Sequence, residues 1–487
     1  VAVLAAAHPA AQAMTVSPLE AARQAGWRPY PRPSRSWPAY LALLCFVAAP
    51  FLLMVSPSIH DPVQAFSAGI AGMLLFLLGL SFLCPAIVSG ASRLLGRCRG
   101  AWALERTLAA DGLRRSPVRA GITVATVVIS LSAIFTIAAF VHSVRGSLLA
   151  WVDQMVTADL IVSSGARTAG PRNVPLREDP ALDFARIPGV QIVDLYRLIR
   201  SSYQGRPILI ESFSAKRSAR VRTLPMAAGD GAEALRAMAE EKGVIVSESF
   251  QSRFGVEKDD RLELATPSGA VTFDVLGVYI DYSSDVGSVL IDRDLYQRYW
   301  RDPLVDAFDL WLAPGANEAA VVQAIKERYG DRYQLFVSTH RELRDAVVNI
   351  MEQSFVVNYA VEIVAVVVAI FSVINTLLAS VLDRTREIGV LRAIGATRDQ
   401  LRRVIVVEAG WMGLVGAVLG LLAGGLMAYH HVAYNTKVLT GWTFQFYYPY
   451  GVAFFCLIAT VFICLGAGYG PARRAASTRI VAAIGYE

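Results

Sequence analysis

Charged residues are scarce in this chain of 487 residues. Asp, Glu, Lys and Arg make up 18% of the sequence, against ~25% in soluble globular proteins, while apolar residues make up 54%. This composition excludes an intrinsically disordered chain, because disorder requires low hydrophobicity and high charge. The net charge of +6 is spread along the chain, which excludes a basic nucleic-acid-binding tail. An integral membrane protein with a large water-exposed part remains.

Cysteine and histidine are also rare, with five and six residues. No Cys-x-x-Cys pair and no Cys/His cluster occurs in the sequence, so neither a disulfide framework nor a metal site is expected. The sequence has no HExxH, GxSxG or paired-carboxylate pattern, which argues against a catalytic site. It also lacks G-x-x-x-x-G-K-[ST], the loop that holds ATP phosphates. We therefore expect no cofactor in this chain, and any ATP and Mg²⁺ to be bound by a partner.

Six apolar segments are long enough to cross a ~30 Å hydrocarbon core as helices. The first is short and contains Pro50. The segments lie at 39–55, 66–90, 120–142, 356–381, 404–430 and 449–470. Seven arginines lie in the connection 92–119 and six in 382–403, whereas 57–65 has no Lys or Arg. The positive-inside rule then predicts that both termini are cytoplasmic and that the region 143–355 lies outside.

The region between the third and fourth spans alternates with period two and carries turn residues, which is typical of strands. Two hairpins are expected, Val190–Arg200 with Pro207–Phe213 and Arg261–Thr266 with Val271–Tyr279. Helices are predicted at 230–242, 247–254, 317–329 and 340–355. Residues 143–157 and 340–355 should continue the neighbouring spans outward as stalks. The predicted fold is a membrane α-helical bundle of about six spans with an extracytoplasmic α+β domain inserted between spans three and four.

Several acidic residues of the external region are close enough in sequence to suggest cation binding. They are Asp281, Asp285, Asp292 and Asp294. They lack EF-hand spacing and its central glycine, so we interpret them as solvated turn residues.

The predicted spans contain small and polar residues at informative positions. Small residues let helix backbones approach closely, so Gly416, Gly420 and Gly424 are expected to pack against another membrane helix. The intramembrane polar residues are Glu362, Asn375 and Glu408. A charge at the bilayer centre costs ~2.5–3.5 kcal/mol on insertion scales. We favour structural bonds to Arg or backbone for the two glutamates, with a proton relay as the alternative.

A short amphipathic helix is predicted directly after the fourth span. Ile388, Leu391 and Ile394 recur at i, i+3 and i+6, with arginines among them, and Gly395-Ala396 allows the chain to turn back. Such a helix leaves an apolar stripe that lipid or a partner must cover. The pattern alone does not choose between these two.

The sequence around this helix closely resembles the FtsX-like permease family, which includes the membrane subunits of MacB/LolCDE-type ABC transporters. The resemblance rests on RTREIGVLRAIGAT at 384–397, the preceding NTLLASVLD, and E-x-x-x-x-G-x-x-G-x-x-x-G from Glu408 to Gly420. It covers 350–487 strongly and reaches Gly243–Glu248 and Val271–Val278 more loosely. It implies a bacterial inner-membrane permease subunit, itself not an enzyme, on which a cytoplasmic ABC ATPase docks. The implied docking residues are Arg384, Arg386, Glu387, Ile388, Gly389, Leu391, Arg392, Ile394, Gly395 and Ala396.

The resemblance also implies a layout and a function. ATP-driven motion would rearrange the external domain to export or extract an amphiphile, lipoprotein or peptide; the alternative is a mechanical regulator of a cell-wall hydrolase. A second permease half or a periplasmic protein is a further possible partner, and nucleic acid is not. Weak likeness between 9–22 and 471–484 suggests the second half of a ten-span, two-repeat permease. The expected layout is a tail of a preceding repeat (1–38), two linking spans (39–92), a basic elbow (93–119), a span (120–142), the external domain with stalks (143–355), a span (356–381), the coupling helix (382–403), two spans (404–470) and a tail (471–487).

Overall fold

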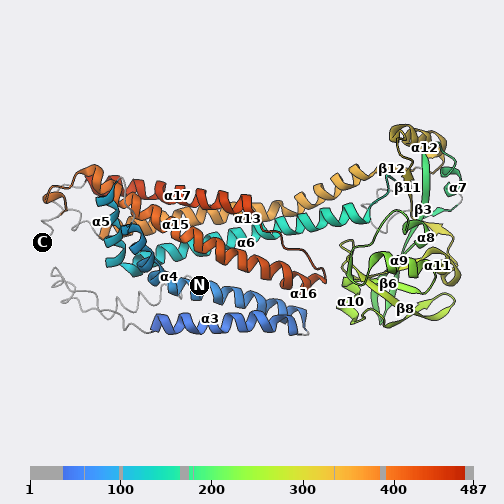
Figure 1. The fold of residues 1–487 in the computed structure, drawn as a ribbon, viewed down its shortest axis with the longest axis horizontal. Helices are drawn as coiled ribbons and strands as arrows, with labels where there is room; N and C mark the ends of the chain where they lie inside the picture. Colours follow the sequence, from blue (N-terminus) through green and yellow to red (C-terminus); the bar gives the residue numbers. More distant parts are fainter. Residues whose placement is uncertain are drawn as a thin grey trace.

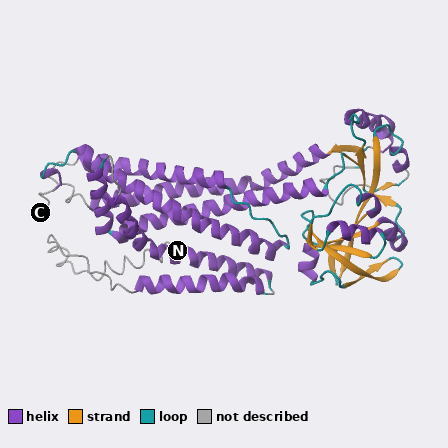
Figure 2. Cartoon of the chain, in the orientation of Figure 1, coloured by secondary structure: helices purple, strands orange, loops and turns teal. Residues whose placement is uncertain are grey.

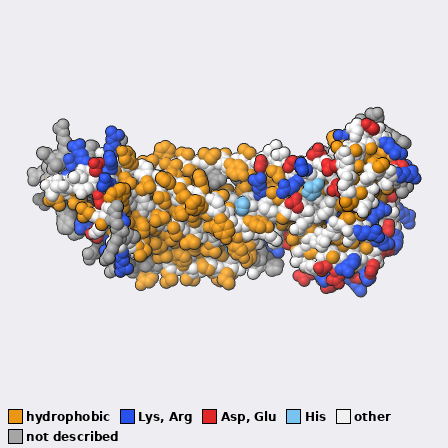
Figure 3. Space-filling view, turned by 45° about the horizontal axis from the view of Figure 1, so that its top comes forward, with side chains coloured by type: hydrophobic (Ala, Val, Ile, Leu, Met, Phe, Trp, Pro, Cys, Tyr) orange, Lys and Arg blue, Asp and Glu red, His pale blue; other side chains and the backbone are white. Residues whose placement is uncertain are grey.

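A long helical bundle carries an α/β domain at one end (Figures 1 and 2). The computed structural model describes residues 37–59, 61–97, 102–164, 175–178, 180–333, 335–383 and 391–477. Apolar side chains cover the middle of the bundle as a broad band, and charged side chains gather at its two ends and on the α/β domain (Figure 3). This distribution is that of a bundle immersed in lipid between two aqueous regions.

The bundle contains a helix at each of the six predicted spans. Its helices are α3 (Trp37–Val55), α4 (Pro62–Arg97), α5 (Ala103–Arg115), α6 (Pro117–Met155), α13 (His340–Asp383), α15 (Arg398–His430) and α17 (Tyr450–Ser477). After α15 the chain continues through a π-helical turn, η3 (His431–Asn435), into α16 (Thr436–Thr440). Among the described residues, five helices are long and apolar enough to cross a membrane, and Tyr40–Val55 is a shorter apolar helix. The first segment is therefore the one that falls short of the sequence expectation.

Two of these helices extend far beyond a membrane's thickness. α6 has 39 residues and α13 has 44, so they are about 58 Å and 66 Å long at 1.5 Å per residue. Neither is broken where it leaves the apolar band, and both reach the α/β domain (Figure 1). Each stalk and its membrane segment are thus one helix.

The α/β domain is built on a mixed sheet of ten described strands. Their order is β12-β1-β11-β3-β4-β9-β6-β8-β5, with β7 paired to β8. The strands are β1 (Leu160–Ser163), β3 (Val190–Tyr203), β4 (Arg206–Phe213), β5 (Met226–Ala228), β6 (Gly243–Ser247), β7 (Arg261–Thr266), β8 (Gly269–Tyr279), β9 (Ser288–Asp292), β11 (Ala307–Leu312) and β12 (Phe336–Thr339). A separate pair joins β2 (Leu176–Arg177) to β10 (Leu304–Val305). The β4–β9 and β6–β8 pairs are parallel, so the chain must cross over between them.

The helices of this domain are short. They are α7 (Pro180–Phe184), α8 (Ala215–Ser218), α9 (Gly231–Ala239), α10 (Glu248–Phe254), α11 (Arg293–Trp300) and α12 (Glu318–Tyr333). Both predicted hairpins, β3–β4 and β7–β8, are confirmed by their pairing. The strands β6 and β9 were not predicted, because all five residues of each are buried. Strands covered on both faces read as continuous apolar runs without alternation.

The interpretation of the acidic group as solvated turns is wrong for two of its members. Asp281 and Asp292 are buried. Asp292 accepts hydrogen bonds from the Asp294 and Ala215 backbone amides, at 3.0 and 2.8 Å, and so begins α11. Asp285 is exposed, as expected. The described residues contain no group of acidic, His and Cys side chains that could hold a metal ion.

Candidate functional site

The end of the bundle opposite the α/β domain carries the segment expected to dock a partner. Residues 391–393 are helical. The Ala396 amide donates to the Leu391 carbonyl at 3.0 Å, and the Gly395 amide donates to Arg392 at 3.2 Å. Gly395 has φ +108, a left-handed conformation that Gly adopts readily, so the helix ends in a Schellman motif. Residues 384–390, with Arg384, Arg386, Glu387, Ile388 and Gly389, lie outside the described residues.

The two described members of the apolar stripe have different environments. Leu391 and Ala396 pack against Leu401, Ile405 and Ala472 at the base of α15 and α17. The Ile394 side chain is 77% exposed. Leu391 therefore holds the turn to the bundle, whereas Ile394 presents an apolar surface that the described chain leaves uncovered.

α15 begins immediately after this turn, and its start is well defined. Thr397 caps the helix: its hydroxyl accepts from the Gln400 amide at 3.2 Å, while the Gln400 side chain accepts from the Thr397 amide at 3.0 Å. This capping box satisfies two amides that a helix start leaves unpaired. Only Thr397 separates Ala396 from the first residue of α15, so a displacement of the turn moves the helix.

Two arginines in the first turns of α15 connect it to neighbouring helices. Arg403 lies 3.7 Å from buried Glu105 of α5, and its guanidinium is 5.2 Å from the Trp102 ring centre. Arg402 lies over the Tyr469 ring of α17 at 5.5 Å. The base of α15, the elbow helix α5 and the end of α17 are thus in contact at one level of the bundle.

Along its length α15 packs closely on α6 through glycines. A Cβ atom at Gly416 would lie 2.7 Å from Val127, one at Gly420 would lie 3.0 Å from Leu131, and one at Gly424 would lie 2.9 Å from the Ser132 carbonyl oxygen. Across this contact Ser132 Oγ donates to Gly420 O at 3.0 Å, and Thr136 Oγ1 donates to Gly424 O at 3.2 Å. The three glycines that the sequence singles out therefore face the stalk helix α6.

The intramembrane polar residues lie on two helices of the bundle. Glu408 is buried on α15, and Asn375 is exposed on α13. The side chain of Glu362 lies outside the described residues.

At the opposite end the two stalks are joined by ion pairs. Asp153 of α6 lies 2.9 Å from Arg344 and 3.7 Å from His340 of α13. Arg145 and Glu352 form a second pair at 3.7 Å. These side chains are partly exposed, and such pairs contribute only ~0–1 kcal/mol each. The stalks are adjacent here but weakly held.

Serine hydroxyls of α6 hold the extended segment 441–449, which connects α16 to α17. Ser147 Oγ accepts from the Gln445 amide at 3.0 Å and donates to the Gln445 carbonyl at 3.4 Å. Ser143 makes the same pair of bonds to Tyr447, at 3.1 and 3.3 Å. Neither serine was predicted from the sequence, although Ser143 and Ser147 stand four apart and so share one face of the helix.

The same segment also contacts the α/β domain. The Tyr282 hydroxyl donates to Thr443 O at 2.7 Å, and the Thr443 amide donates to Glu248 Oε2 at 3.2 Å. Burial raises the pKa of Glu248, and the Thr443 bond opposes that rise. Phe444 is buried and stacks on Tyr282 at 4.8 Å. Trp442 and Phe444 thus pack on the α/β domain.

Comparison with known proteins places both halves of this arrangement. The MacB-like periplasmic core domain matches residues 120–328, and the FtsX-like permease C-terminal domain matches residues 359–480. The chain thus combines an FtsX-like permease C-terminal domain with a MacB-like periplasmic core domain. The first match covers α6 and most of the α/β domain. The second covers the end of α13 together with α15 and α17.

Curated relatives of this chain are ABC transporter proteins. An uncharacterized ABC transporter permease protein of Mycobacterium tuberculosis is 29% identical over 424 residues, which are 85% of this chain and 49% of the relative. The macrolide export ATP-binding/permease protein MacB of Bordetella avium is 24% identical over 395 residues, 78% of this chain and 59% of the relative. The chain spans about half the length of these relatives. The permease match and the apolar helices indicate a multi-pass membrane protein.

Two solved structures are similar to part of this chain. The periplasmic region of MacB from Actinobacillus actinomycetemcomitans matches with a TM-score of 0.31 and 10% identity, over 40% of this chain and 94% of that structure. The extracellular domain of the noncanonic ABC-type transporter YknZ from Gram-positive bacteria matches with a TM-score of 0.28 and 12% identity, over 37% of this chain and 99% of that structure.

Proposed function

We propose that this FtsX-like permease transmits force from a cytoplasmic ABC ATPase to its extracytoplasmic α/β domain, in order to export or extract an amphiphile, lipoprotein or peptide. The ATPase hydrolyses ATP, and this chain supplies the moving parts. The observation that carries the proposal is the exposed Ile394 on a turn that is fixed to α15 by a Schellman motif and a capping box.

The path from that turn to the external domain consists of rigid, contacting elements. A push on the turn moves α15, because the capping box leaves no flexible linker between them. α15 contacts α6 through glycine positions, where the backbones are too close to slide without separating. α6 then runs unbroken to Met155. Packed helices shift as units rather than deforming continuously, so motion at one end reaches the other.

The cargo class is supported by the names of the relatives and by the position of the domain. The Bordetella avium relative is a macrolide export protein, and a macrolide is an amphiphilic molecule. The α/β domain sits beyond the apolar band of the bundle, where a molecule leaving the outer face of a membrane first meets it. We therefore place amphiphiles first among the three cargo classes.

The test is retention of the ATPase by a variant of the exposed apolar residue. Ile394→Asp places a charge on the surface assigned to the ATPase, and losing an apolar contact residue at an interface centre weakens binding about tenfold or more. Leu104→Asp is the matched control, because Leu104 is also an exposed apolar residue, 58% exposed, on the neighbouring helix α5. We expect a purified, co-expressed ATPase to be lost from Ile394→Asp and kept by Leu104→Asp.

Leu391→Asp separates docking from folding. Leu391 packs on α15 and α17, so its replacement by Asp is expected to lower the thermal stability of the bundle, whereas Ile394→Asp leaves it unchanged. Full retention of the ATPase by a folded Ile394→Asp protein contradicts the proposed docking surface.

A further inference from the structure

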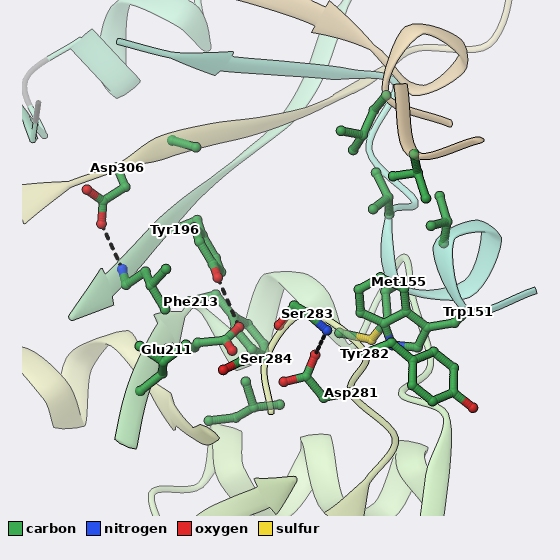
Figure 4. A pocket seen from close by; sticks show the side chains of 18 of the residues that line it. Trp151, Met155, Tyr196, Glu211, Phe213, Asp281, Tyr282, Ser283, Ser284 and Asp306 are labelled. Carbon is green, nitrogen blue, oxygen red and sulfur yellow. Dashed lines mark hydrogen bonds between the residues drawn. The ribbon is translucent and has the colours of Figure 1, made fainter. Parts of the chain in front are cut away.

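A cavity of about 780 Å³ lies between the two stalks and the sheet of the α/β domain (Figure 4). Its walls come from α6, from α13, from strands β3 and β4, and from the loop 281–286. Its volume falls within the ~300–1,000 Å³ of small-molecule sites. On α6 its lining begins at Leu148, next to Ser147, which binds the segment 441–449.

One side of the cavity is apolar and aromatic. The stalks contribute Trp151, Met155, Leu343, Val347 and Met351. Trp151 is held in place, because its indole N–H donates to Ile280 O at 2.9 Å and its ring lies 5.8 Å from that of Tyr282. This wall suits hydrocarbon, and the aromatic faces attract organic cations.

The other side carries two carboxylates. Glu211 accepts from the Tyr196 hydroxyl at 2.9 Å, and Asp281 accepts from Ser288 Oγ at 2.6 Å and the Ser283 amide at 2.8 Å. The Tyr279 hydroxyl lies between them, 2.7 Å from Ser288 Oγ, 3.4 Å from Glu211 and 3.3 Å from Asp281. Burial and the two carboxylates raise the pKa of Tyr279, so it remains a neutral donor whose single proton serves one acceptor at a time.

The charge of Asp281 is not balanced by a neighbouring side chain. Asp281 is 2% exposed, and in the part of the chain that the structure describes its partners are two hydroxyls and one amide, all neutral. A buried ionised carboxylate is costly unless it is paired with a cation. The cavity that it lines therefore offers the place for one.

The remaining charged residues that line the cavity are Asp306, Arg222 and Arg200. Asp306 accepts two bonds of 3.1 Å from Arg197. The Arg222 guanidinium lies 4.2 Å over the Phe213 ring, donates to Met155 O at 3.5 Å and interacts with buried Asp194. Arg200 is exposed. Among the described residues, the hydrogen bonds of Asp281 come from neutral donors and not from these arginines.

We propose that this cavity binds an amphiphile with a protonated amine, whose ammonium group meets Asp281 and Glu211 while its hydrocarbon part lies against Trp151 and the apolar side chains of α13. An ammonium group supplies three donors, which suits two neighbouring carboxylates. This inference rests on the proposed function only in taking an amphiphile as the cargo.

The walls make occupancy sensitive to the stalks. Trp151 and Met155 move with α6, and Val347 and Met351 move with α13, so a relative shift of the two helices changes the size of the cavity. Binding of the amine and movement of the stalks are therefore linked, since a ligand that fits one arrangement better stabilises it.

The experiment uses the full chain in phosphatidylcholine nanodiscs without nucleotide or ATPase. The probe is dodecylamine with a photoreactive diazirine in its tail, and labelled peptides are identified by mass spectrometry. Dodecylamine, dodecanol and dodecanoate compete as cationic, neutral and anionic molecules of one chain length. We expect labels on peptides that contain 148–155 and 343–351, with dodecylamine competing at least about tenfold better than dodecanol and dodecanoate not at all.

Variants connect the label to the carboxylates. Asp281→Asn with Glu211→Gln keeps the size of both groups and removes their charge, so the advantage of dodecylamine over dodecanol should fall about tenfold or more. Asp285→Asn is the matched control, an exposed aspartate of the same loop, and should change nothing. Val347→Trp fills the cavity and should abolish labelling, which keeps the test decisive if the double variant does not fold.

Equal competition by dodecylamine and dodecanol, labels elsewhere in the chain, or unchanged labelling of Val347→Trp each overturn the proposal. The outcome is separable from force transmission, because no ATPase is present. If labelling is absent but binding of the ATPase still depends on Ile394, only the proposed amine site is contradicted. If labelling is specific but Ile394→Asp still binds the ATPase, only the proposed force transmission is contradicted.

Discussion

Adding a single methyl group at Gly424 should disrupt the contact between α15 and α6. In Gly424→Ala the added Cβ would lie 2.9 Å from the carbonyl oxygen and 3.0 Å from Cα of Ser132. Both atoms belong to backbone, so no side-chain rotation relieves the overlap, and the helices must separate. Separation also stretches the bonds from Ser132 to Gly420 and from Thr136 to Gly424.

Gly466→Ala is the matched control for the size of this effect. Gly466 lies in α17, also within a membrane-spanning helix, and a Cβ there meets no described atom within 4 Å. Both substitutions gain the same ~0.5–1 kcal/mol that Ala holds over Gly in a helix, so this gain cancels in their difference. What remains is the cost of overpacking, ~1–3 kcal/mol.

The assay is thermal unfolding of both variants in nanodiscs, followed by ATPase activity of the complex. Gly424→Ala should unfold at a lower temperature than the parent chain, and Gly466→Ala at the same or a higher temperature. If force passes through this contact, Gly424→Ala should also weaken the coupling of ATP hydrolysis to movement of the α/β domain, measured by distances between spin labels. Identical behaviour of the two variants would falsify the close approach of α15 and α6.

Three further predictions concern the outer end of the molecule. Ser147→Ala leaves the Gln445 amide and carbonyl unpaired and should cost ~1–3 kcal/mol of stability. Ser147→Thr keeps the hydroxyl and should keep the stability of the parent chain. Equal stability of the two variants contradicts the pairing. Folding raises the pKa of Glu248. Between the ordinary glutamate pKa and the raised one, the folded chain keeps a proton on Glu248 that the unfolded chain has released. The free energy of unfolding should therefore fall as pH rises through this range. Glu248→Gln should flatten that slope in thermal melts, and an unchanged slope assigns it to other groups. Asp153→Asn removes exposed ion pairs to Arg344 and His340 and should change stability by less than ~1 kcal/mol; a larger loss shows that the stalks are held together more firmly than these contacts imply.

Local signals predicted much of the fold. The turn at 203–206 and the alternation beside it specify the β3–β4 hairpin, and a continuous run of apolar residues specifies each long helix. The strands β6 and β9 escaped prediction because burial on both faces removes alternation. Their pairing, parallel in β6–β8 and antiparallel in β6–β9, depends on contacts between distant segments that periodicity does not encode.

The candidate site was predicted unevenly for a related reason. Spacing alone places Leu391 and Ile394 on one helix face, yet one packs on α15 and the other is exposed. The difference arises from α17, whose Ala472 covers Leu391 and which lies about 80 residues further along the chain. Asp281 was misjudged in the same way, because the hydroxyl of Ser288 that binds it belongs to a strand that the sequence did not reveal.

The bonds from Ser143 and Ser147 to the segment 441–449 give the α/β domain a third attachment to the bundle, in addition to α6 and α13. Two helices could act as a hinge, about which a domain tilts freely. With the added attachment through Thr443 and Tyr282, the domain is held at three points: α6, α13 and the α16–α17 connection. A body held at three points tilts only when one attachment is released or changes its length. Any large tilt of the domain must therefore first break the hydrogen bonds between the segment 441–449 and the serines of α6.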